Sequence, residues 1–66
     1  MQIYLNGEEK QIPEGLDMAG LIALLELTDQ RVAVEVNEEL VPRSTFPGHP
    51  LKSNDRVEII HAVGGG

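Results

Sequence analysis

The residues best suited to take part in a reaction lie at the end of the chain, where Gly64, Gly65 and Gly66 follow an apolar run. Glycine has no Cβ and loses the most backbone freedom on ordering, so three in succession resist a fixed conformation. We therefore expect a flexible tail with a bare terminal carboxylate, slender enough to enter a narrow enzyme channel. The competing interpretation is an inert, frayed terminus, because chain ends are commonly disordered.

The chemistry of such a tail would need a second protein. A carboxylate is a poor acyl donor, because its leaving group is oxide-like and its carbon is electron-rich. A partner enzyme must convert the Gly66 carboxylate to a mixed anhydride, for instance with AMP, before sulfide or an amine can attack. Three extended residues reach about 10 Å at roughly 3.3–3.6 Å per residue, so docking would hold the carboxylate inside a channel while the domain stays outside.

Side chains elsewhere in the sequence offer no comparable site. The chain has no cysteine, so thiolate catalysis and cysteine-based zinc sites are unavailable. His49 and His61 do not form an i, i+4 ligand pair, and we interpret each as a structural or surface residue. Gly7 and Gly15 are too isolated for a phosphate-binding loop. We therefore predict a protein that is not an enzyme, with no metal and no bound cofactor.

Length and composition narrow the class of protein further. Sixty-six residues, of which 41% are hydrophobic, predict one domain near the lower size limit for an autonomous core. The net charge of −6 argues against nucleic-acid binding and favours basic protein partners. No apolar run is long enough to span a bilayer, and no basic-then-apolar signal segment opens the chain. We expect a cytoplasmic protein, monomeric when free, that does not bind membranes.

Hydrophobic periodicity predicts the elements of the first half of the chain. Alternation over residues 1–6 indicates a strand, and Asn6-Gly7 is a strong two-residue hairpin signal before a polar edge strand at 9–12. Asp17 is a plausible N-cap for a helix over 18–27 that ends at Thr28-Asp29-Gln30. The residues expected on its buried face are Met18, Leu21, Leu24 and Leu25.

The second half of the chain contains the clearest strand, over residues 31–37, where every second residue is valine. A short strand at 40–41 follows, and then an irregular segment in which Phe46 is expected to fill the core. The last strand covers 56–63 and leads into the tail. This order predicts an α+β domain over 1–63, with the tail at 64–66 and one main helix packed across a mixed sheet. If the first and last strands are central neighbours, the fold is a β-grasp roll, although periodicity alone leaves the strand order open.

One apolar patch is expected next to the tail. If Val57 and Ile59 face the core, then Ile60 and Ala62 point to the face that the helix leaves uncovered. Tyr4 shares this outward parity on the first strand. We predict that Tyr4, Ile60 and Ala62 dock a partner, since apolar patches on small domains tend to be interaction sites. Isolated exposed hydrophobic residues are the alternative interpretation.

Two segments, residues 34–44 and 55–66, closely resemble the ThiS family of sulfur carrier proteins of thiamine biosynthesis. The resemblance implies a ubiquitin-like β-grasp fold whose terminal residue, Gly66, is adenylated by an ATP-dependent, E1-like activating enzyme. It further implies that a sulfur donor such as a cysteine desulfurase converts Gly66 to a thiocarboxylate, and that thiazole synthase accepts the sulfur. One departure from the family is Asn54 before Asp55, where glycine is common; Asn tolerates a left-handed conformation, so we expect the turn to survive.

Three alternatives share the same fold and tail. The first is the small subunit of molybdopterin synthase, whose relatives are usually longer and lack the Val41-Pro42-Arg43 segment. The second is a ubiquitin-like modifier that forms isopeptide bonds with lysines, and the third is an interaction module with an inert tail. We interpret Pro42 and Arg43 as a turn and a surface contact.

Overall fold

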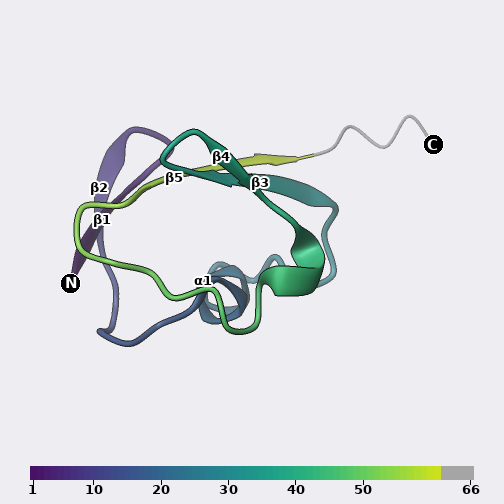
Figure 1. The fold of residues 1–66 in the computed structure, drawn as a ribbon, viewed down its shortest axis with the longest axis horizontal. Helices are drawn as coiled ribbons and strands as arrows, with labels where there is room; N and C mark the ends of the chain where they lie inside the picture. The colour runs from purple at the N-terminus through teal and green to yellow at the C-terminus, as the bar shows by residue number, and fades with distance from the viewer. Residues whose placement is uncertain (62–66) are drawn as a thin grey trace.

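Five strands form one mixed sheet, and an α-helix lies across one of its faces, in the computed structural model, which describes residues 1–61 (Figure 1). The elements in chain order are β1 (Gln2–Leu5), β2 (Glu8–Gln11), α1 (Met18–Leu24), β3 (Val32–Val36), β4 (Glu39–Val41), the 3-10 helix η1 (Arg43–Thr45) and β5 (Arg56–His61). The strand order is β2-β1-β5-β3-β4. β1 and β5 run parallel, and the other neighbours are antiparallel.

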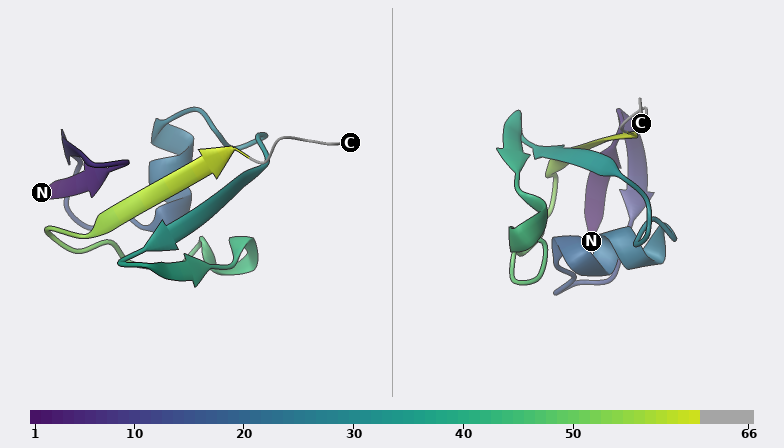
Figure 2. Two further views of the ribbon diagram at one scale, coloured as in Figure 1. Left: turned by 90° about the horizontal axis from the view of Figure 1, so that it is seen from above. Right: turned by 90° about the vertical axis from the view of Figure 1, so that its right-hand side faces the viewer.

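The first and last strands are therefore neighbours at the centre of the sheet, which confirms the β-grasp arrangement. Figure 2 shows β5 between β1 and β3, with α1 crossing beneath the sheet. The opposite face of the sheet has no helix over it in the described part of the chain, and we call it the open face. The strand that leads towards the C-terminus, β5, is therefore the central strand and is paired on both sides.

Two tight hairpin turns connect the outer strands to the sheet. Asn6 and Gly7 have φ angles of 50° and 84°, and they separate Leu5 from its partner Glu8. Positive φ at both central positions is what a type I′ turn requires, so the predicted hairpin is confirmed. The second turn uses Asn37 and Glu38, with φ angles of 51° and 69°, and places Glu39 already in β4.

The helix begins where the sequence predicts and ends earlier. The Gly20 N–H donates to Asp17 Oδ1 at 2.8 Å, which confirms the N-cap. At the other end Glu26 adopts a φ of 60°, and the Leu27 N–H donates to the Ile22 oxygen at 2.9 Å. A left-handed residue followed by this backward hydrogen bond is the Schellman arrangement, and it stops α1 after Leu24. The predicted end at residue 27 is therefore wrong.

The prediction for the buried face of α1 was also partly wrong. Met18 and Leu21 are fully buried, but Leu24 is 50% exposed and Leu25 only half-buried. Ile22 takes the expected place of Leu24, so the buried stripe of α1 runs through Met18, Leu21 and Ile22. Phe46, next to η1, fills the core as expected. The complete core comprises Ile3, Ile12, Met18, Leu21, Ile22, Val34, Val36, Val41, Phe46, Leu51, Val57 and Ile59.

Candidate functional site

The tail itself lies outside the described residues. The predicted reactive residue Gly66, the threading residues Gly64 and Gly65, and the docking residue Ala62 all belong to 62–66, so their roles stay predictions. The described chain reaches His61 at the end of β5, where His61 is paired with Val32 of β3. The site described below is thus the part of the sheet from which the tail departs.

The alternation along β5 agrees with the predicted parity. Val57 is fully buried and Ile59 is 8% exposed, whereas Ile60 is 59% exposed. Leucine and isoleucine side chains this exposed are few in the described chain: Leu24, Leu40 and Ile60. Ile60 is the member of this group that lies on the central strand, next to the point where the chain leaves the sheet.

The structure separates Tyr4 from Ile60. Tyr4 is half-buried and lies opposite Arg56, and the parallel pairing ends with Leu5 opposite Val57. Ile60 is four residues beyond Arg56, a span of about 13 Å at roughly 3.3 Å per residue. The expectation that Tyr4 and Ile60 adjoin is therefore wrong, because β1 turns away before β5 reaches Ile60. Whether either residue docks a partner stays a prediction.

The apolar residue opposite Ile60 comes from β3, and a second exposed apolar residue lies farther out on β4. Ala33 of β3 lies directly opposite Ile60, and directly opposed residues of neighbouring strands share one face. Leu40 of β4 lies opposite Glu35 on the same face and is 68% exposed. We call Ala33, Leu40 and Ile60 the open-face patch. Alternation around Val34 and Val41 in the sequence is enough to predict that Ala33 and Leu40 face outward. It does not predict that Ala33 lies opposite Ile60.

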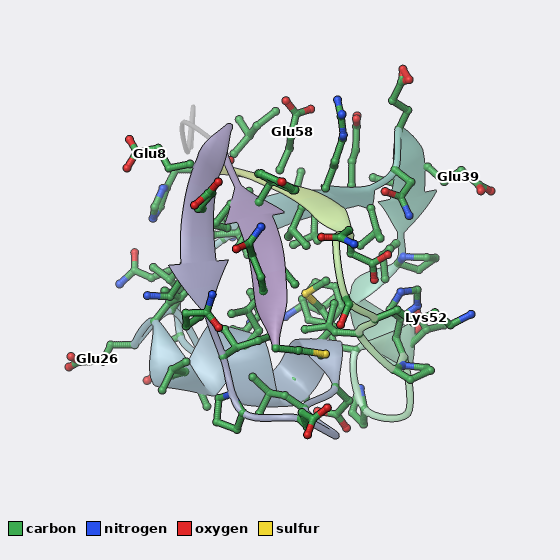
Figure 3. All side chains as sticks on the ribbon, turned by 90° about the vertical axis from the view of Figure 1, so that its left-hand side faces the viewer. Glu8, Glu26, Glu39, Lys52 and Glu58 are labelled. Atoms are coloured by element: carbon green, nitrogen blue, oxygen red, sulfur yellow. The ribbon has the colours of Figure 1, made fainter. Side chains whose placement is uncertain are left out.

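Two acidic side chains lie on the open face beside the patch residues. Glu35 and Glu58 are direct cross-strand partners there. Figure 3 shows Glu58 pointing away from the helix, with Glu8 and Glu39 towards the two edges of the sheet. Apolar residues with adjacent acidic residues are complementary to a partner surface that carries an apolar pocket and basic residues.

The remaining side chains singled out in the sequence have structural contacts. Arg43 donates from Nη2 to the Thr28 oxygen at 2.8 Å, which ties η1 to the segment after α1 and supports the interpretation of Arg43 as a surface contact. Asn54, in the turn before β5, has a φ of 70°, as expected of a residue that replaces glycine. In residues 1–61 no three His, Asp or Glu side chains gather as metal ligands would, and no helix there is long and apolar enough to cross a membrane.

The pKa of Asp17 is lowered by its two backbone partners. The Gly20 N–H at the start of α1 makes the larger contribution, and the Gly48 N–H donates to Asp17 Oδ2 at 3.2 Å. Hydrogen bonds to the ionised carboxylate favour the charged form. Asp17 thus joins the helix to the loop that follows η1, and its carboxylate has a structural role on the side of the sheet away from the open face.

Comparison with known proteins now gives the family. A sequence model of the ThiS family matches residues 3–66. The chain is 38% identical over all its 66 residues to a thiazole synthase of Magnetococcus marinus, of whose length it spans 20%. It is 26% identical to the sulfur carrier protein ThiS of Escherichia coli, with both chains covered completely.

A solved structure agrees with this assignment. The crystal structure of the thiamine biosynthesis protein ThiS from Geobacter metallireducens superposes with a TM-score of 0.86 and is 30% identical, again with both chains covered completely. The family match includes the glycines that follow β5, and the superposition covers the mixed sheet and its helix. The chain therefore belongs to the ThiS family.

Proposed function

We propose that this chain is a sulfur carrier of thiamine biosynthesis that bears sulfur on the carboxyl carbon of Gly66. The observation that carries the proposal is the family match over residues 3–66, which extends through the terminal glycines. Its geometric support is that these glycines continue the chain from β5, the central strand of the sheet. In this proposal the chain presents the reacting group, and partner enzymes perform the catalysis.

The charging reaction has two steps. An E1-like enzyme binds ATP, and the Gly66 carboxylate attacks the α-phosphorus, so that pyrophosphate leaves and an acyl adenylate forms. A thiol reductant releases sulfide from the persulfide of a donor such as a cysteine desulfurase and is itself oxidised to a disulfide. The sulfide then attacks the acyl carbon. The bond from that carbon to the AMP oxygen breaks, AMP leaves, and a thiocarboxylate remains on Gly66. ATP is thus a substrate of the partner, and AMP and then sulfur are attached to the chain covalently.

Thiazole synthase is the proposed acceptor of the sulfur. Support comes from the Magnetococcus marinus relative, which carries the name thiazole synthase and contains a counterpart of this entire chain within one longer polypeptide. Joining two parts in one polypeptide raises their effective concentration. That arrangement is useful when one part must deliver a group to the other.

Docking is proposed to use the open face of the sheet. Ile60 is 59% exposed on the central strand, with Ala33 opposite it and Leu40 on the same face in β4, and Ala62 is expected to extend the same surface. Tyr4 is retained as a separate, half-buried contact farther along the face. The net charge of −6 would steer the carrier towards basic partner surfaces.

Intact-mass spectrometry tests this function. The full chain is incubated with ATP, the adenylating enzyme from the same cells and a sulfide source, and we expect the mass change of one oxygen replaced by sulfur. A chain that lacks only Gly66 is the matched control and should stay unmodified while its circular dichroism is unchanged.

Each alternative function predicts a different result. Attachment of the chain to lysines of other proteins would identify a modifier, and an unchanged mass would identify an inert interaction module. A permanent complex with the large subunit of molybdopterin synthase, with no sulfur passed to thiazole synthase, would identify the molybdopterin carrier. Any of these three results would contradict the proposed function.

A further inference from the structure

The side chain of Asn6 continues a strand pairing that the backbone of β1 has left. The Asn6 N–H donates to the Val57 oxygen at 2.9 Å, as the next residue of a parallel ladder would. The chain then turns into β2, yet the Ile59 N–H donates to Asn6 Oδ1 at 2.9 Å. In return Asn6 Nδ2 donates to the Ile59 oxygen at 3.4 Å. The carboxamide therefore substitutes for the missing peptide group of β1.

This substitution is possible because a carboxamide offers the same acceptor and donor as a peptide unit. β1 pairs with β5 only at Tyr4–Arg56 and Leu5–Val57, so its backbone supports the first part of β5. Farther along, β3 holds one side of β5 up to His61. On the other side the contact at Ile59 is made by Asn6. On the side of β5 that faces β1, a single side chain thus holds the last part of the strand.

Asn37 provides an internal comparison. It also occupies the first central position of a two-residue turn with positive φ, and its carboxamide also bonds to the start of the same strand. The Arg56 N–H donates to Asn37 Oδ1 at 3.0 Å, and Asn37 Nδ2 donates to Asp55 Oδ1 at 3.1 Å. The two asparagines therefore share a turn type and a clamping function, but they hold opposite ends of β5.

We propose that Asn6 is a positioning residue for the carrier reaction: its carboxamide fixes Ile59 and thereby the end of β5, from which the chain continues to the reacting carboxyl. This inference rests on the proposed function. Ile60, in the open-face patch, is the residue that follows Ile59, so the same clamp holds the docking surface and the end of β5 in one fixed relation. A fixed end of β5 leaves less orientational freedom to be lost when the docked carrier delivers its carboxyl.

The test compares Asn6→Gly with Asn37→Gly. Glycine accepts positive φ readily, so both variants keep their turns, and each loses only its side-chain hydrogen bonds. In Asn6→Gly we expect faster hydrogen exchange at the Ile59 amide and a kcat for adenylation lower by about tenfold, with KM little changed. In Asn37→Gly the exchange increase should appear at Arg56, and kcat should stay close to that of the wild type.

A conservative variant guards against a folding artefact. Asn6→Asp keeps an acceptor for the Ile59 N–H and loses the donor to the Ile59 oxygen, so its kcat should lie between those of the wild type and Asn6→Gly. Equal kcat values for Asn6→Gly and Asn37→Gly, with normal charging of the wild type, would overturn the role of Asn6 alone. Failure of the wild-type chain to be adenylated would overturn the proposed function, and the positioning role with it.

Discussion

The two faces of the sheet carry similar aliphatic side chains in very different surroundings. On the covered face Ile3, Val34 and Val57 are fully buried between the sheet and α1. On the open face Leu40 and Ile60 remain 68% and 59% exposed. Burial of apolar surface stabilises the fold at about 25 cal/mol per Å² removed from water. The covered face therefore accounts for stability, whereas the open-face side chains have most of their burial still to gain from a partner.

The largest effect is expected from a core truncation on the covered side. Leu21→Ala removes a fully buried side chain of α1 and should cost roughly 2–5 kcal/mol of unfolding free energy. For a domain of this size that loss approaches the whole stability. Urea denaturation followed by circular dichroism measures it. Leu24→Ala, on the same helix at a 50% exposed position, is the matched control and should cost less than about 1 kcal/mol.

The next largest effect is expected from Ile60→Glu, which should weaken docking to a partner and leave the stability of the fold nearly unchanged. Ile60→Glu places a charge in the open-face patch beside Glu58 and should raise the KM for the adenylating enzyme about tenfold, since central interface anchors carry more than about 1 kcal/mol. The unfolding free energy should change by no more than about 1 kcal/mol. Leu24→Glu makes the same change at an exposed residue of the helix and should leave KM unaltered. If Ile60→Glu unfolds the chain instead, the open-face side chain has a structural role that its exposure does not indicate.

The smallest effect is expected from Asp17, whose carboxylate joins α1 to the loop after η1. Because the pKa of Asp17 is lowered in the folded state from its ordinary 3.8, its ionised form adds stability above that value. The contribution is lost as the pH falls through the still lower folded pKa. Thermal unfolding between pH 7 and pH 2 should therefore show a decline for the wild type that Asp17→Asn partly removes.

Asparagine is the appropriate replacement because it also caps helices and carries no charge. At pH 7 the Asp17→Asn variant should unfold only slightly below the wild type. Identical pH profiles for the two proteins would mean that other carboxylates account for the acid sensitivity, and that the Gly20 and Gly48 hydrogen bonds to Asp17 contribute little.

Local pattern predicted most of the elements because their causes are local. Valine alternation, the Asn6-Gly7 pair and the Asp17 cap each act within a few residues, and all three are confirmed. The end of α1 was missed because Glu26 adopts a left-handed conformation that glycine or asparagine usually supplies. Leu24 was misplaced for a related reason, since a helix of seven residues leaves little periodicity from which to locate its buried stripe.

The candidate site likewise has features that local sequence predicts and features that it does not. Sequence alone determines that Ile60 faces outward, that three glycines follow the last strand, and that the chain resembles a carrier family. The tertiary structure decided which outward residues meet: Ala33 lies opposite Ile60, and Tyr4 does not adjoin it. It also decided that Asn6 clamps Ile59, 53 residues away. Side-chain parity follows from neighbours two residues apart, whereas register follows from pairing between distant strands, and no local pattern encodes it.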